Sequence, residues 1–114
     1  MRFWGLKSCD TCRKALKELR QSGVEPEVID VRADGVAPAD IARFYAAFQA
    51  DLLNRRSTTW RGLTADERAG DALALLADHP TLMKRPVIEV EGQLFLGWNA
   101  QQRDQLLGIQ RPTP

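Results

Sequence analysis

The chain has 114 residues, of which 44% are hydrophobic and 27% are charged, with 16 basic and 15 acidic residues. These values are typical of one small globular domain that can bury a core without disulfides or a structural metal. A nearly neutral chain lacks the marked basic excess of a nucleic-acid-binding protein, although Arg55, Arg56 and Arg61 form a local basic cluster. No apolar stretch reaches the ~18 residues of a membrane-spanning helix, and the first residues do not match a signal peptide, so we expect a cytoplasmic protein.

The N-terminal part of the sequence predicts a strand, a helix and a second strand. Arg2–Gly5 is short and partly apolar, and residues 11–22 carry apolar side chains at helical spacing, with Glu18 on the polar face. Residues 27–31 are rich in valine and isoleucine and are expected to form a strand. Strand, helix and strand within about 30 residues are typical of a βαβ unit.

The middle of the chain, from Pro38 to about Met83, predicts only helices. Pro38 suits the first position of a helix, and the apolar residues after it follow the helical period. A further helix is predicted from Thr64 to Asp78, because Thr64 and Glu67 match a capping box. We expect this segment to be a helical insertion.

The C-terminal part predicts a β-hairpin, with strands over 86–90 and 93–96 and a turn at Glu91-Gly92, followed by a helix over 100–107. This order of elements resembles a thioredoxin-like domain, an α/β fold with a mixed four-stranded sheet. We expect one domain over residues 1–109, with the helical insertion at about 38–83. The polar, proline-containing residues 110–114 are expected to be a flexible tail.

The two cysteines, Cys9 and Cys12, lie three positions apart near the N-terminus. A secreted protein with structural disulfides would carry more cysteines, spread along the chain to close long loops. A structural zinc site usually needs four cysteine or histidine ligands, and His79 is the one histidine of the sequence. The spacing therefore favours reversible thiol chemistry.

Cys9 is the expected nucleophile, because it lies where the first strand passes into the first helix. Unpaired backbone N–H groups and the helix dipole stabilise a thiolate at such a position. Lys7 and Arg13 add positive charge nearby, whereas Asp10 opposes it. The balance predicts a pKa for Cys9 below the ordinary thiol value of about 8.5. Cys12 follows one turn later on the apolar face, where it is less exposed and can resolve a mixed disulfide.

A second charged segment, Lys84-Arg85-Pro86, precedes a predicted strand. The residues alone leave two possibilities for Arg85: a solvated charge beside a turn, or an anion clamp that faces the cysteine loop. His79 precedes Pro80 near a predicted helix end, and we expect it to be a cap or packing residue rather than a general base.

Together these motifs resemble the arsenate reductase (ArsC)/Spx family of thioredoxin-like proteins, over nearly the whole chain. The resemblance is carried by the cysteine loop, residues 52–60, His79-Pro80, Lys84-Arg85-Pro86 and Leu96-Gly97-Trp98. Residues 5–11 and 52–60 are most similar to the YffB branch, whose proposed role is glutathione-dependent thiol reduction.

The resemblance implies that Cys9 is the nucleophile and that Arg85 binds an anion or thiol ligand beside it. It also implies that the Arg85–Pro86 peptide bond is cis. Arg56 matches an arginine of the YffB and Spx-like segment, and it is either an anion ligand, which we favour, or a solvated arginine. The residues expected to contact the substrate or its anionic group are Lys7, Asp10, Thr11, Arg13, Arg56, Arg85 and Pro86.

The leading hypothesis is therefore a thiol–disulfide oxidoreductase that depends on glutathione. Cys9 would attack a glutathione mixed disulfide, and Cys12 or a second glutathione would release the product. We expect no bound cofactor and no metal, glutathione as the co-substrate and glutaredoxin as a further partner.

Two alternatives stay open. Arsenate reductases of this fold use three arginines around the cysteine, but here the first falls on Asn54 and the third on Gly97, and their upstream histidine falls on Gly5. Arsenate would lose at least one charge-assisted contact, worth about 1.5–3 kcal/mol. The other alternative is an Spx-like regulator that binds RNA polymerase and uses Cys9 and Cys12 as a redox switch.

Overall fold

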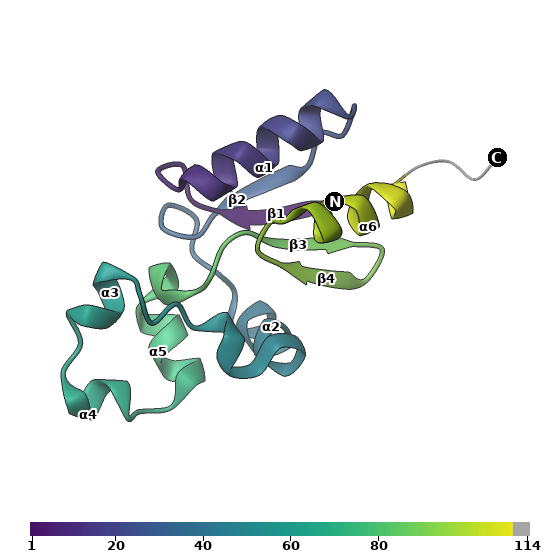
Figure 1. The fold of residues 1–114 in the computed structure, drawn as a ribbon. Helices are drawn as coiled ribbons and strands as arrows, with labels where there is room; N and C mark the ends of the chain where they lie inside the picture. The colour runs from purple at the N-terminus through teal and green to yellow at the C-terminus, as the bar shows by residue number, and fades with distance from the viewer. Residues whose placement is uncertain (111–114) are drawn as a thin grey trace. The chain divides into compact units, whose positions relative to one another are not determined.

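The computed structural model describes residues 1–110, which fold as a unit that contains a sheet and a unit made of helices (Figure 1). The first unit combines residues 1–30 with the chain from Arg85 onward, and the second is Val31–Lys84. The chain thus leaves the sheet after its second strand and returns just before the third. The helical stretch expected at 38–83 falls inside the second unit, and the assignment of both units to one domain stays a prediction.

The expected mixed four-stranded sheet is confirmed. Its strands are β1 (Arg2–Gly5), β2 (Glu27–Asp30), β3 (Val87–Val90) and β4 (Gln93–Leu96). Their order is β2-β1-β3-β4, with β1 parallel to β2 and both other pairs antiparallel. The central strand β1 pairs Phe3 with Val28 on one side and with Ile88 on the other.

Two helices, α1 (Asp10–Gln21) and α6 (Ala100–Gln110), pack on one face of this sheet (Figure 1). Phe3 and Ile88 lie opposite each other on that face, because paired residues of neighbouring strands point the same way. The buried residues of the helices that pack on them are Cys12, Ala15, Leu19 and Leu106. An apolar layer therefore fills the space between the sheet and these two helices, and Cys12 is part of it.

The second unit contains four α-helices and two short 3₁₀ helices. They are α2 (Pro38–Phe48), η1 (Gln49–Leu52), α3 (Thr58–Arg61), α4 (Ala65–Arg68), α5 (Ala72–Asp78) and η2 (Pro80–Leu82). The helix predicted to start at Pro38 is confirmed. It packs against α5, and the buried side chains of the two helices are Ile41, Phe44, Leu75 and Leu76.

A short antiparallel bridge between Leu53 and Met83 closes the second unit, in a segment where the sequence predicted only helices. The Asn54 N–H donates to the Leu82 carbonyl at 2.8 Å, and the Lys84 N–H donates to the Leu52 carbonyl at 2.7 Å. This bridge holds the segment that begins at Asn54 next to the end of the unit at Lys84.

The single helix predicted over residues 64–78 is wrong, because the chain forms α4 and α5 there. The predicted capping box is present, with the Glu67 N–H donating to the Thr64 hydroxyl at 3.1 Å and the Thr64 N–H donating to the Glu67 carboxylate at 2.9 Å. Gly70 then disfavours a continued helix, and Asp71 caps a new one by accepting a backbone hydrogen bond at 3.2 Å. The apolar residues keep their helical spacing across Gly70 and Asp71, which is why the sequence predicted one helix.

Other element ends differ by one to three residues. Helix α1 begins at Asp10 rather than at residue 11, and α6 continues to Gln110 rather than ending at residue 107. Residues 111–114 of the predicted tail lie outside the described part of the chain. Within residues 1–110, the helices are too short or too polar to cross a bilayer.

Replacing Leu106 with alanine should lower the free energy of unfolding by about 2–5 kcal/mol, because the change leaves a cavity between α6 and the sheet. Leu106 is 0% exposed, whereas Leu73, on α5, is 38% exposed. The matched Leu73→Ala variant should lose less than about 1 kcal/mol. Urea denaturation measures both, and equal losses would contradict the placement of Leu106 in the core.

Candidate active site

Cys9 occupies the turn between β1 and α1, as its N-cap residue, with extended backbone angles of φ −88° and ψ 118°. Its N–H donates to the Leu6 carbonyl at 3.0 Å, and its own carbonyl accepts from the Arg13 N–H at 3.0 Å. The side chain is half-buried and makes no capping hydrogen bond of the usual geometry. The backbone is thus fixed on both sides of a sulfur that lies at the start of a helix.

Several groups around the Cys9 sulfur favour its thiolate. Burial raises the pKa of the Cys9 thiol, but the backbone N–H and the thiol of Cys12 lower it, as do the charge and a hydrogen bond of Arg85. The net effect is a pKa below the ordinary value. A helix-start amide and a guanidinium are the two kinds of donor that stabilise an anion at such a site.

Cys12 has the opposite character, because it is 1% exposed and belongs to the core. The net effect of its surroundings is to raise the pKa of the Cys12 thiol to about 12. Burial is the main cause; the backbone of Leu6 lowers the pKa, Cys9 raises it and Arg85 lowers it. The thiol pair is therefore asymmetric. Cys9 can carry the charge while Cys12 keeps its proton and donates it to the neighbouring sulfur.

Arg85 and Pro86 lie beside this pair, where β3 begins. Their peptide bond is cis, as the resemblance implied, and Pro86 is buried, with its carbonyl accepting from the Gly97 N–H at 2.8 Å. Since the guanidinium of Arg85 acts on both cysteines, the structure supports the second possibility for this residue, which faces the cysteine loop. Its contact with a substrate stays a prediction.

Gly5 lets β1 approach the thiol pair closely. A Cβ atom at this position would lie 2.7 Å from the Phe3 ring and 3.1 Å from the Cys12 sulfur. Any side chain would force one of these buried groups to move. The histidine that arsenate reductases carry here could not be added without repacking the site.

Gly97, at the other end of the site, has a φ of 79°. Residues with a Cβ adopt this conformation at a cost, so an arginine at this position would strain the backbone. The chain therefore departs from the three-arginine pattern in conformation as well as in sequence.

The charges expected to act on Cys9 from nearby in the sequence do not do so. The groups that lower its pKa belong to Cys12 and Arg85, and neither Lys7 nor Arg13 is among them. Arg13 instead forms an ion pair with Asp10 on the first turn of α1. For Arg13 this pair is the reason, because Asp10 balances its charge, whereas Lys7 is exposed to solvent, which screens its charge. Lys7 and Thr11 are exposed on either side of Cys9, and their contacts with a substrate stay predictions.

Arg56 lies in the second unit, whereas the two cysteines and Arg85 lie in the first. With Asn54, Arg55 and Lys84 it lines a hollow of about 430 Å³. The Asn54 side-chain oxygen accepts from the Arg56 N–H at 3.1 Å, which fixes the backbone of this basic segment. The role of Arg56 as an anion ligand stays a prediction.

Sequence reasoning missed an interaction that connects the loop after β4 to α1. The Trp98 indole N–H donates to the Glu18 carboxylate, and Arg103 lies 3.5 Å from the same carboxylate. Glu18 was assigned to the solvent face, and the sequence gives no signal that a tryptophan eighty positions later pairs with it. The helix-start N–H groups predicted beside Cys9 include that of Cys12, whereas the effect of the Leu6 backbone on Cys12 was not predicted.

Comparison with known proteins gives a consistent relationship. The sequence model of the ArsC family matches residues 4–106. An uncharacterized protein of Haemophilus influenzae is 40% identical over 106 residues, which cover 87% of this chain and 91% of that protein.

Solved structures agree with this match. A protein named YFFB (PA3664) has a TM-score of 0.83 at 29% identity, over 92% of this chain and 96% of that one. An arsenate reductase (ArsC) related protein from Brucella melitensis has a TM-score of 0.70 at 32% identity, over 94% and 95% of the two chains. These structures confirm the expected thioredoxin-like fold.

Replacing Arg85 with glutamine should raise the pKa of Cys9, because the change removes the positive charge that favours its thiolate. Mass spectrometry measures the rate of Cys9 alkylation by iodoacetamide across a pH series. The midpoint of this pH profile should therefore move to higher pH. Lys7→Gln is the matched control, because it also removes one positive charge, two positions from Cys9. It should shift the profile less, since Lys7 is not among the groups that lower the pKa of Cys9. Equal shifts in the two variants would show that Arg85 has no special position.

Proposed function

This chain belongs to the ArsC family, and on that basis we propose that it is a thiol–disulfide oxidoreductase with the Cys9 thiolate as its nucleophile. The observation that carries the proposal is the convergence of Arg85 and the Cys12 N–H on the Cys9 sulfur. Disulfides are attacked by thiolates and not by thiols, so a lowered pKa at a half-buried sulfur supports this chemistry. The arsenate reductase-related relative supports the same general class of reaction.

We propose a glutathione mixed disulfide as the substrate. The Cys9 thiolate attacks the glutathionyl sulfur, so that a Cys9–glutathione disulfide forms and the original disulfide breaks. The substrate's sulfur leaves as a thiolate and takes a proton from water. Arg85 and the free N–H groups at the start of α1 suit the carboxylates of glutathione, because both attract anions.

Two routes complete the cycle. A second glutathione can attack the Cys9-bound sulfur of the first, which gives glutathione disulfide and returns the Cys9 thiolate. Alternatively, Cys12 attacks Cys9, which releases the bound glutathione as a thiol and leaves a Cys9–Cys12 disulfide. Two further glutathione molecules then reduce this disulfide. Both routes give the same net reaction, in which the mixed disulfide and one glutathione thiol yield the substrate thiol and glutathione disulfide.

The state of Cys9 controls the second route. While Cys9 is a thiolate, its charge and hydrogen bond contribute to the raised pKa of Cys12. Formation of the mixed disulfide removes that charge, so Cys12 loses its proton more readily when an electrophilic sulfur stands beside it. Burial remains the main cause of its raised pKa. We therefore propose that glutathione carries most of the turnover at neutral pH and that the share of Cys12 grows at higher pH.

Arsenate reduction is the second candidate, and the position of Arg85 beside a nucleophilic cysteine favours it. Arsenate would form a Cys9–arsenic bond with loss of water, and glutathione with glutaredoxin would then supply two electrons. The missing side chains at Gly5 and Gly97 weaken this candidate. An Spx-like role at RNA polymerase is supported only by the Cys9–Cys12 spacing.

Cys9→Ser should lower glutathione-dependent reduction of a small mixed disulfide by about 10³-fold or more, because the variant has no nucleophile. Cys12→Ser should stay within about tenfold of the wild type at pH 7, because glutathione replaces the resolving thiol and serine keeps a hydrogen-bond donor. Coupled oxidation of NADPH by glutathione reductase measures both rates. An active Cys9→Ser variant would sink the proposal.

The wild type should reduce arsenate at least about tenfold more slowly than the mixed disulfide in the presence of glutathione and glutaredoxin. The physical reason is the lost charge-assisted contact, which corresponds to roughly a tenfold to hundredfold loss of transition-state stabilisation. NADPH oxidation with arsenate as the sole acceptor tests this expectation. A Cys9-dependent rate comparable to that with the mixed disulfide would move arsenate reduction to first place.

A further inference from the structure

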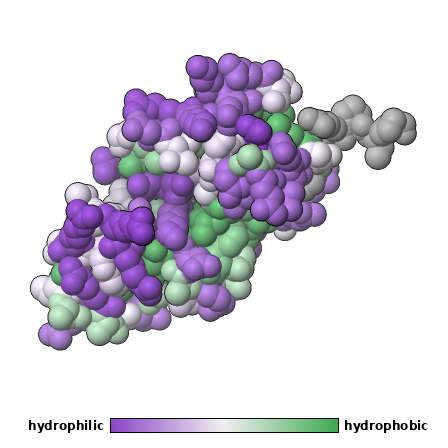
Figure 2. Space-filling view, viewed as in Figure 1, coloured by the Kyte–Doolittle hydropathy of each residue, from purple (hydrophilic) through white to green (hydrophobic). Residues whose placement is uncertain are grey.

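The outer side of α1 is basic, and the proposed chemistry leaves this surface unexplained. The helix contains four basic residues, Arg13, Lys14, Lys17 and Arg20, in a chain whose net charge is only +1. One of its two acidic residues, Glu18, is turned toward Trp98 and Arg103 instead. Figure 2 shows a hydrophilic surface over this helix, at the top of the view.

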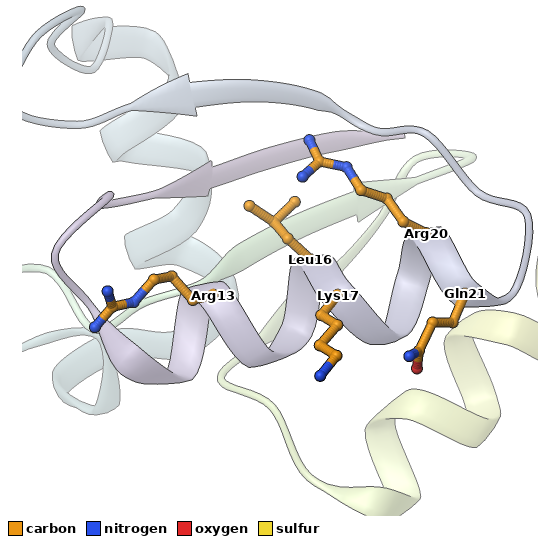
Figure 3. A pocket seen from close by; sticks show the side chains of 5 residues that line it. All are labelled: Arg13, Leu16, Lys17, Arg20 and Gln21. Atoms are coloured by element: carbon orange, nitrogen blue, oxygen red, sulfur yellow. The ribbon is translucent and has the colours of Figure 1, made fainter.

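A groove with a volume of about 500 Å³ runs along this side of α1 between two rows of side chains (Figure 3). Residues four positions apart form continuous ridges on a helix, with a groove between neighbouring ridges. One ridge is Arg13, Lys17 and Gln21, and the other is Leu16 and Arg20.

Four positions before Arg13 on the first ridge stands Cys9, and four positions before Leu16 on the second stands Cys12. The first ridge therefore begins one helix turn after the half-buried Cys9, whereas Cys12 lies beneath the second ridge in the core. A chain segment that presents a disulfide to Cys9 and continues along α1 would lie in this groove.

The side chains along the groove can exchange their present partners for others. Arg13 and Arg20 are exposed and paired with Asp10 and Glu25, and exposed ion pairs of this kind contribute little stability. Lys17 is exposed and makes no ion pair with any residue that the structure describes. Leu16 is half-buried and adds a small apolar contact.

Resting on the proposed function, we propose that this groove binds an acidic segment of a protein that carries the disulfide attacked by Cys9. The basic side chains lie about 6–17 Å from Cys9 along the helix axis, at about 1.5 Å per residue. An extended segment advances about 3.3 Å per residue, so its acidic residues should stand about two to five positions from its reactive cysteine. The covalent step is that of the proposed function: the Cys9–glutathione disulfide forms, and the cysteine of the protein leaves as a thiolate.

A protein partner fits this groove better than a nucleic acid does. The groove begins at Arg13, one helix turn from Cys9, and only a partner that carries a sulfur uses both the basic ridges and the nucleophile. Nucleic-acid binding relies on many contacts between basic residues and phosphates, and a chain with a net charge of only +1 lacks the marked basic excess that such contacts require.

The test compares short peptides that carry one glutathionylated cysteine. One has glutamates two to five positions after the cysteine, and its counterpart has glutamines at the same positions. Lys17→Glu is the test variant, and Arg61→Glu makes the same charge change at an exposed residue on α3. The wild type should have a kcat/KM for the glutamate peptide at least about fivefold above that for the glutamine peptide at low salt. Lys17→Glu should abolish this preference and Arg61→Glu should keep it.

A preference that is absent in the wild type, or that survives Lys17→Glu, would overturn the inference. Reduction of glutathionylated cysteine itself by the same variants reports on the proposed function separately, because this substrate has no peptide segment to extend along α1 to Lys17, about 12 Å from Cys9. Should that reaction fail, fluorescence anisotropy with serine versions of the peptides still decides the inference: binding of the glutamate version must weaken in Lys17→Glu. Tighter binding of a short single-stranded DNA than of the glutamate peptide would also overturn it.

Discussion

The stabilisation of a thiolate at the start of α1 is the interaction around which the site is arranged. A half-buried sulfur anion loses hydration, and here that loss is offset by the Cys12 N–H and the Arg85 guanidinium. For these groups to meet, β1 must end just before Cys9 and α1 must begin just after it. The strand that follows Arg85 must also pair with β1. The antiparallel pairing of β1 with β3 meets this last condition.

Cys12 is both a packed residue of the core and a hydrogen-bond donor to Cys9. It fills the core between α1 and the sheet, with Gly5 so near that a Cβ would lie 3.1 Å from its sulfur, and burial keeps it protonated. A protonated Cys12 thiol can donate a hydrogen bond to the Cys9 thiolate. The burial that keeps Cys12 protonated therefore also stabilises the negative charge on Cys9. The charge on Cys9 in turn keeps Cys12 protonated. The two thiols are thus distinguished by their depth within one helix turn.

The preference that we propose for a mixed disulfide over arsenate rests partly on two positions that carry no side chain. Gly5 and Gly97 stand where arsenate reductases of this fold carry side chains, and the structure gives each a physical reason: a close approach at Gly5 and a positive φ at Gly97. What remains beside the thiolate is Arg85, a single guanidinium that suits a carboxylate of a thiol ligand. On the outer side of α1, the basic ridges add a surface that a small oxyanion could not use.

The sequence by itself determined the order of the elements, the mixed sheet and the cysteine loop at a strand-to-helix junction. It did so because apolar period, capping and turn residues act over a few neighbouring positions. Tertiary structure decided what the sulfur of Cys9 meets. Lys7 and Arg13 are near in sequence but do not act on it, whereas Arg85, seventy-six positions away, does. The Trp98–Glu18 contact escaped prediction for the same reason, whereas the helix-start donor of Cys12 was predicted from its place in the chain. Electrostatic interactions depend on distance in space, and only the packing of strands and helices sets that distance.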